Sequence, residues 1–95
     1  MAKYTVRVEL HSNQYTPDFE TLHREMSKEG FSKLIAAEGG KTYHLPRGEY
    51  NISTSSNISE VLNATKRAVR ATGESAEILV TESARRSWDG LTEKK

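Results

Sequence analysis

The sequence contains no cysteine and no long hydrophobic run. Without cysteine the protein has no disulfide, no thiolate zinc site and no thiol nucleophile. It also lacks the stretch of about eighteen apolar residues that a membrane-spanning helix needs. The first ten residues lack the apolar run of a signal peptide. These absences predict a cytoplasmic protein that does not enter a membrane.

A strong net charge of one sign is also missing, because the sequence contains 14 Lys and Arg residues and 13 Asp and Glu residues. Overall charge therefore does not favour binding to nucleic acid or to a membrane, and any basic surface must come from local arrangement. Ninety-five residues are enough for one domain with one core.

Motifs that carry chemistry on their own are absent as well. The histidines at positions 11, 23 and 44 do not have the spacing of a metal-ligand pair on a helix. Gly39-Gly40 is not followed by the Lys-Ser/Thr pair of a phosphate-binding loop, and no Gly-x-Ser-x-Gly elbow is present. Glu9 alone is a weak magnesium ligand. We therefore predict no metal site and no cofactor.

What the first half does contain is a strand pattern followed by a helix pattern. A period of two predicts a half-buried strand, with its apolar side formed by Tyr4, Val6, Val8 and Leu10. Thr16-Pro17 resembles a helix start, with a hydroxyl cap and proline in the first turn. Gly30 is a typical helix end. We expect a first helix over residues 17–29, with Phe19, Leu22 and Met26 buried.

The second half contains three strand candidates and a second helix. Residues 31–37, 49–54 and 76–81 are the expected strands, and residues 42–45 could form an extended arm. Asn57 and Glu60 have the spacing of a capping box, and Gly73 ends the helix that follows. Its expected buried stripe is Ile58, Val61, Leu62, Thr65, Ala68, Val69 and Thr72.

The resulting order, βαββαβ, predicts an α+β protein of ferredoxin-like fold, with a four-stranded antiparallel sheet and two helices on one face. We expect this domain to span residues 1–82, followed by a polar tail over residues 83–95 in which Trp88 anchors the tail to the domain. The opposite sheet face should be bare. It lacks the aromatic side chains with which RNA-recognition modules of this topology stack bases.

Candidate catalytic residues lie at the end of the first strand and on the first helix. Glu9 and His11 stand two residues apart, so a carboxylate and an imidazole could project from one side and transfer a proton. The alternative is a solvated strand end. His23 and Arg24 lie off the apolar stripe of the helix and are either solubilising or functional.

Basic side chains gather in two places. The second helix carries Lys66, Arg67 and Arg70, and Arg85 and Arg86 follow the last strand. Such groups could hold the phosphates of a nucleic acid without reading its sequence. A solvated helix surface would explain the helical group equally well.

Several segments resemble the GhoS-type antitoxins, small endoribonucleases of type V toxin–antitoxin systems. The similar segments run from Tyr4 to Glu9, from Phe31 to Ala36 and from Tyr50 to Thr54, and similar single residues are Tyr15, Phe19, Leu22, Met26 and Leu45. The resemblance implies a domain similar to the Cas2 nucleases. It also implies that the protein cleaves the messenger RNA of a partner membrane toxin.

The resemblance also indicates roles for individual residues. An acidic residue often ends the first strand in this wider group, and Glu9 holds that position with Glu in place of the commoner Asp. A basic residue of the first helix corresponds to His23 or to Arg24 beside it. Our hypothesis makes Glu9, His11 and His23 the acid or base, with phosphates held by Arg7, Arg24, Lys66, Arg67, Arg70, Arg85 and Arg86.

A second hypothesis belongs to a different class of function. The chain could be a non-catalytic interaction domain that forms a homodimer through its open sheet face or through the arm at residues 42–45. RNA affinity that falls steeply with salt would distinguish the first hypothesis from the second.

Overall fold

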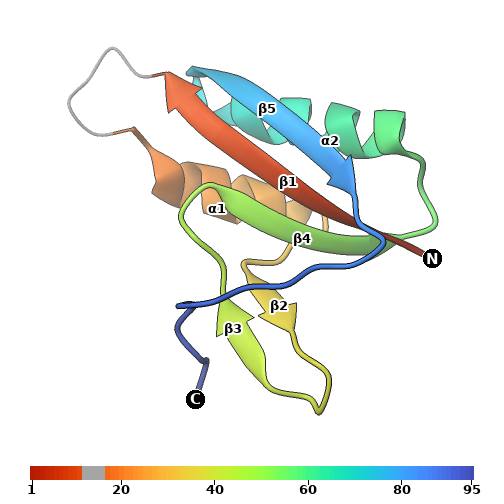
Figure 1. The fold of residues 1–95 in the computed structure, drawn as a ribbon. Helices are drawn as coiled ribbons and strands as arrows, with labels where there is room; N and C mark the ends of the chain where they lie inside the picture. Colours follow the sequence, from red (N-terminus) through yellow and green to blue (C-terminus); the bar gives the residue numbers. More distant parts are fainter. Residues whose placement is uncertain (12–16) are drawn as a thin grey trace.

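The computed structural model describes residues 1–11 and 17–95, and these form five strands and two helices (Figure 1). The elements are, in order, β1 (Ala2–His11), α1 (Phe19–Lys28), β2 (Leu34–Ala36), β3 (Thr42–His44), β4 (Glu49–Thr54), α2 (Ile58–Thr72) and β5 (Ser75–Glu82).

Both helices begin at a side chain that caps their first turn. The Thr21 backbone N–H donates to Asp18 Oδ1 over 2.9 Å, so α1 is capped by Asp18 and begins two residues later than expected. The expected cap, Thr16, lies outside the described residues. The α2 prediction is confirmed: Asn57 and Glu60 form a capping box, and Gly73 ends the helix with φ of 76°.

The prediction of one four-stranded sheet is wrong. β4, β1 and β5 form a three-stranded antiparallel sheet in that order, and β2 and β3 form a separate antiparallel pair. The chain after α1 has one backbone bridge to the larger sheet, at Ser32, which exchanges two backbone hydrogen bonds of 2.8 Å with Asn51. It then diverges, because Gly39 and Gly40 adopt positive φ and turn it back on itself. Residues 42–44 thereby supply the backbone partners that β4 was expected to supply.

The core lies between the three-stranded sheet and the two helices, which cover one face together as predicted (Figure 1). The alternation in β1 is confirmed, since Tyr4, Val6, Val8 and Leu10 are all buried. They pack with the buried side chains of the helices, which are Phe19, Leu22, Met26, Val61, Thr65, Ala68 and Val69. Ile58 was expected in this core but is 44% exposed.

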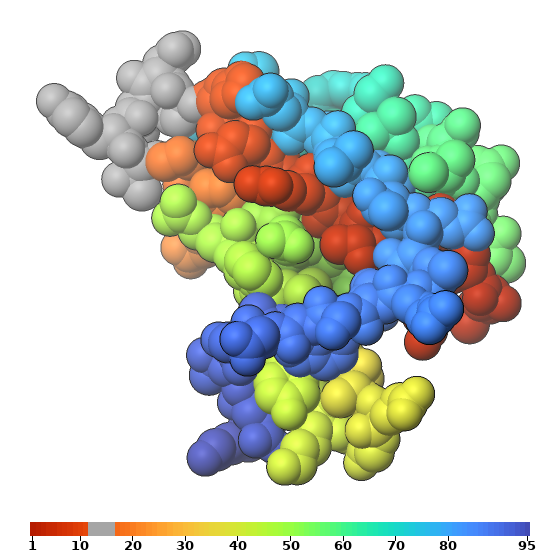
Figure 2. Space-filling view, in the orientation of Figure 1, coloured from red at the N-terminus to blue at the C-terminus, as the bar shows by residue number. Residues whose placement is uncertain are grey.

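The opposite face of the sheet is bare only in part, which corrects another expectation: the tail lies against Thr5 and Asn51, whereas Arg7, Glu9 and His11 are exposed. Residues 83–95 leave the end of β5, pass along the β4 side of the sheet and continue alongside the β2–β3 hairpin (Figures 1 and 2). Arg86 Nη1 donates to Asn51 Oδ1 over 2.6 Å, and Ser83 N–H donates to the Lys3 carbonyl over 2.8 Å. Two further backbone hydrogen bonds join the end of the tail to β3, from His44 to Thr92 and from Lys94 to Thr42.

Trp88 anchors this tail, as its position in the sequence predicts. Its indole meets the Tyr43 ring edge-on, with ring centroids 5.7 Å apart and an interplanar angle of 62°. The polar end of the chain thus contacts both the three-stranded sheet and the β2–β3 pair.

Candidate functional site

Three of the predicted site residues form a row on the uncovered part of β1. Arg7, Glu9 and His11 are exposed and alternate with the buried residues Val8 and Leu10, so their side chains point away from the helices. Cross-strand pairing places Glu9 opposite Glu77 of β5 and Arg7 opposite Leu79. Arg7, Glu9, Glu77 and Leu79 line a shallow hollow on this face.

Glu77 is the residue of this site that sequence reasoning missed. His11 Nε2 lies 2.9 Å from Glu77 Oε1, and both side chains are exposed. A carboxylate at this distance orients the imidazole ring. The signal available in the sequence was weak, because Glu77 stands on the polar side of β5 but its partner depends on the strand register.

The row combines three kinds of chemistry within five residues of one strand. Glu9 offers a carboxylate, His11 an imidazole held by a second carboxylate, and Arg7 a guanidinium for a phosphate. An acid–base pair beside a cation can transfer protons while an anionic transition state is stabilised. This surface is accessible to a large substrate.

His23 lies on the other face of the sheet. Its Nδ1 is hydrogen-bonded to the Tyr50 hydroxyl, and its ring packs near Phe19 with centroids 6.0 Å apart. Burial lowers the pKa of His23, and the nearby charges of Lys33 and Arg47 lower it further. The imidazole is therefore neutral near pH 7. The predicted group of Glu9, His11 and His23 is divided between two faces of the sheet.

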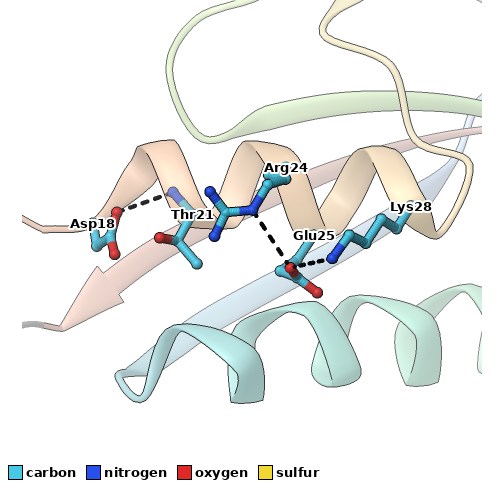
Figure 3. Close-up of polar contacts among 5 residues, drawn as sticks. All are labelled: Asp18, Thr21, Arg24, Glu25 and Lys28. Atoms are coloured by element: carbon cyan, nitrogen blue, oxygen red, sulfur yellow. Dashed lines mark hydrogen bonds and ion pairs between the residues drawn. The ribbon is translucent and has the colours of Figure 1, made fainter.

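Arg24 also belongs to the helical side. Its Nε lies 3.8 Å from Glu25 Oε2, and the same carboxylate oxygen accepts a hydrogen bond from Lys28 over 3.0 Å (Figure 3). The side chain of Arg24 is 60% exposed. The structure thus separates Arg24 from Glu9 and His11.

The predicted basic group on α2 has two different roles in the structure. Arg67 donates to both carboxylate oxygens of Glu29, over 2.9 and 3.2 Å, and so links α2 to the end of α1. These hydrogen bonds lower the pKa of Glu29 and raise that of Arg67. Lys66 and Arg70 are exposed on α2. All three lie on the helical side, away from the β1 row.

Arg85 and Arg86, by contrast, lie on the sheet face that carries the β1 row. Arg86 reaches β1 as well as β4, because its Nη1 also lies 3.4 Å from Thr5 Oγ1. Burial lowers the pKa of Arg86. Arg85 is exposed beside it. The tail therefore brings two cations to the same face as Arg7, Glu9 and His11.

Two further properties bear on function. Within residues 1–11 and 17–95, no three His, Asp or Glu residues are grouped so that they could hold a metal ion. Neither helix of the described chain has the length and apolar character needed to cross a membrane.

Comparison with protein families decides the broader class. Residues 1–88 match the family described as Endoribonuclease GhoS. The chain belongs to the GhoS endoribonuclease family. The match begins at the N-terminus, includes both sheets and extends to Trp88 in the tail, so it contains all the site residues discussed above. A search of curated proteins found no match. The resemblance inferred from the sequence is confirmed.

Proposed function

We propose that this protein is an antitoxin endoribonuclease that binds RNA on the uncovered face of β1 and cleaves it there. The observation that carries the proposal is the row of Arg7, Glu9 and His11, with the His11 imidazole held by Glu77. Membership of the GhoS family supports RNA as the substrate and phosphodiester cleavage as the reaction.

The residues suit cleavage by the RNA's own 2′-hydroxyl group. Glu9 removes the 2′-hydroxyl proton, and the oxygen attacks the adjacent phosphorus atom. Protonated His11 donates its proton to the departing 5′-oxygen, leaving a 2′,3′-cyclic phosphate and a 5′-hydroxyl. Arg7 stabilises the charge that develops on the phosphate oxygens. His23 and Arg24, on the helical side, have no step in this scheme.

The family also supports a biological substrate for the reaction. We propose that the RNA is the messenger of a partner membrane toxin and that cleavage takes place in the cytoplasm. The antitoxin would silence the toxin by destroying its message, without binding the toxin protein or the membrane.

The test is cleavage of an end-labelled RNA that contains both single-stranded and hairpin regions, with EDTA or with magnesium. Replacing Glu9 or His11 by Gln should slow cleavage by about a hundredfold, the usual contribution of a general acid or base. Glu20→Gln, an exposed change on α1, is the matched control and should cleave normally. Intact RNA with the wild-type protein, or full activity in both variants, contradicts the proposal.

A second candidate function, self-association, is favoured by the outer edge of β5. This strand pairs with β1 and with no other strand of the described chain. Leu79 is 61% exposed, and Ile58 and Leu62 of α2 line a groove along the same edge. An uncovered strand edge beside apolar side chains is suited to pairing with another strand.

The occupant that fits this edge is β5 of a second copy. If a twofold axis passes through Leu79, antiparallel pairing places Ile78 opposite Val80 and Glu77 opposite Thr81. No like charges then face one another. The arm at residues 42–45, which the sequence suggested for pairing, is less suitable because Thr42–His44 is paired with β2 and bonded to the tail.

Sedimentation at increasing protein concentration tests this candidate. The wild type should dimerise, and Leu79→Lys should remain monomeric because two ammonium groups would meet at the axis. Ser53→Lys, also exposed on the open face but on β4, should dimerise like the wild type. A wild-type protein that stays monomeric at every concentration contradicts the candidate.

A further inference from the structure

A cavity of about 370 Å³ lies where the tail passes between β1 and the β2–β3 hairpin. Its walls come from segments far apart in the sequence, namely the start of β1, the hairpin and the first residues of the tail. The lining includes Lys3, Tyr43, Arg85 and Trp88. None of these belongs to the proposed cleavage site on β1.

The aromatic side of this cavity can accept a flat ring. Trp88 is only half-buried, and it also forms part of a second hollow next to Ile35 and Leu45. Tyr43 meets it edge-on at 62°, so the two rings are not stacked face to face on each other. Indole and phenol faces of this kind are the surfaces on which proteins stack the bases of single-stranded nucleic acids.

The charged side of the cavity is basic. Lys3, Arg85 and Arg86 contribute three cations, and Glu38 is the one acidic residue of the lining. This imbalance is local, since positive and negative charges nearly cancel over the whole chain. Arg86 is engaged by Asn51 and Thr5, whereas Lys3 and Arg85 are exposed. Exposed cations beside an aromatic ring suit the phosphates that flank a bound base.

We infer that this cavity binds one base of a single-stranded RNA, stacked on Trp88, with Lys3 and Arg85 on the neighbouring phosphates. The inference rests on the proposed RNA-cleaving function and names its substrate class. Arg86 contacts Thr5, two residues before Arg7 on the same face of β1, so the strand can continue from the cavity to the cleavage row. A base inside a duplex cannot reach the cavity, and therefore single strands are the preferred substrate.

Trp88 is the one tryptophan of the sequence, so tryptophan fluorescence reports on the surroundings of this ring alone. The probes are a single-stranded RNA of about ten nucleotides, an abasic strand of the same length and charge, and the RNA duplex. Fluorescence anisotropy of a label on each probe measures binding independently. The single strand should quench Trp88, whereas the abasic strand and the duplex should leave its emission unchanged even where they bind.

Variants separate stacking from charge. Trp88→Leu should weaken single-strand binding roughly tenfold, because stacking of one base contributes about 1–3 kcal/mol, whereas Trp88→Phe should retain most of the affinity. Lys3→Ala combined with Arg85→Ala should lower the slope of log affinity against log salt by about 1.4, the loss of two phosphate contacts. Amide exchange at His44 and Lys94 checks that the tail stays bound to β3 in each variant.

The two proposals fail in different ways. If RNA binds and is cleaved but quenches Trp88 no more than the abasic strand does, and Trp88→Leu binds as tightly as the wild type, the base-binding cavity is overturned and the cleavage site stands. If anisotropy shows no RNA binding to the wild type, both proposals are wrong. Quenching by the single strand together with the loss in Trp88→Leu supports the inference.

Discussion

Arg86 Nη1 lies 2.6 Å from Asn51 Oδ1, which joins the tail to β4 across 35 residues of sequence. Asn51 also exchanges backbone hydrogen bonds with Ser32, so this one residue of β4 contacts both the tail and the chain that leads into the hairpin. The position of the tail on the open face therefore depends on a few polar contacts.

Loss of the Arg86 side chain should release the tail. A hydrogen bond from a charged donor contributes about 1.5–3 kcal/mol, so Arg86→Ala should speed amide exchange at His44 and Lys94 roughly tenfold or more. The His44 N–H donates to Thr92 of the tail, and the Lys94 N–H belongs to the tail and donates to Thr42 of β3. Arg85→Ala is the control, because Arg85 is exposed. Unchanged exchange in Arg86→Ala would show that the remaining contacts, namely Trp88 on Tyr43 and the backbone hydrogen bonds, hold the tail without Arg86.

Replacement of Gly48 by alanine should destabilise the protein more than replacement of Gly39, a glycine with nearly the same φ. It has φ of +92°, and an added Cβ would lie 2.5 Å from the Val8 carbonyl oxygen. Gly39 has φ of +91° with nothing within 4 Å of the added atom. Gly39→Ala should cost about 1–2 kcal/mol of stability from backbone strain.

The additional clash should make Gly48→Ala less stable than Gly39→Ala by about 1–3 kcal/mol, measured by urea unfolding. The Gly48 carbonyl also accepts a 2.7 Å hydrogen bond from the Val8 N–H. A shift of residue 48 away from Val8 to relieve the clash would therefore strain this hydrogen bond at the junction of β1 and β4. Equal stabilities of the two variants would contradict this account.

The environment of His23 should make stability depend on pH. Because burial, Lys33 and Arg47 lower the pKa of His23 in the folded protein, protons bind the unfolded chain more readily. The contribution of His23 to the free energy of unfolding is therefore fully present above its unfolded pKa of about 6.5 and is lost as the pH falls below that value.

Unfolding measurements at pH 7.5 and 5.5 test this dependence. His23→Gln has no titrating imidazole, so its stability should fall less over this interval than that of the wild type. His44→Gln, a change at an exposed residue of β3, should behave like the wild type. The same fall in stability for His23→Gln and the wild type would show that other groups cause the pH dependence.

If His11 acts as the acid in RNA cleavage, Glu77 positions its ring and should affect the rate without binding RNA. Glu77→Ala should slow single-turnover cleavage about tenfold. Glu77→Gln should restore part of that loss, because its amide oxygen can still accept a hydrogen bond from His11. RNA affinity should change little in either variant. Thr81→Ala, another exposed change on β5, is the control. Normal cleavage by Glu77→Ala would remove Glu77 from the scheme.

Local patterns in the sequence were sufficient for the elements whose signals lie within a few neighbouring residues. The alternation from Tyr4 to Leu10, the capping box of Asn57 and Glu60 and the glycine that ends α2 all appear as predicted. The strand at Glu49–Thr54 has its expected bounds. In each case the preference arises from backbone geometry or from burial on one face.

Features that depend on pairing between distant segments were not predictable in this way. The second strand was expected to join the larger sheet, but Leu34–Ala36 pairs with Thr42–His44 because a local hairpin costs less chain entropy than a distant partner. The role of Glu77 depends on the β1–β5 register, which places it beside His11. Neither the pairing partner of β2 nor the contact between Glu77 and His11 can be inferred from neighbouring residues in the sequence.

By itself, the sequence determined the family, the two amphipathic helices, the alternating first strand and the candidate residues on its polar side. Only the tertiary structure decided that Glu9 and His11 lie on a different face from His23, and that Arg86 and Trp88 fold back over the open face. The physical reason is the range of the interactions involved. Periodicity and capping act between near neighbours, whereas side-chain contacts across strands exist only after the chain has brought distant residues together.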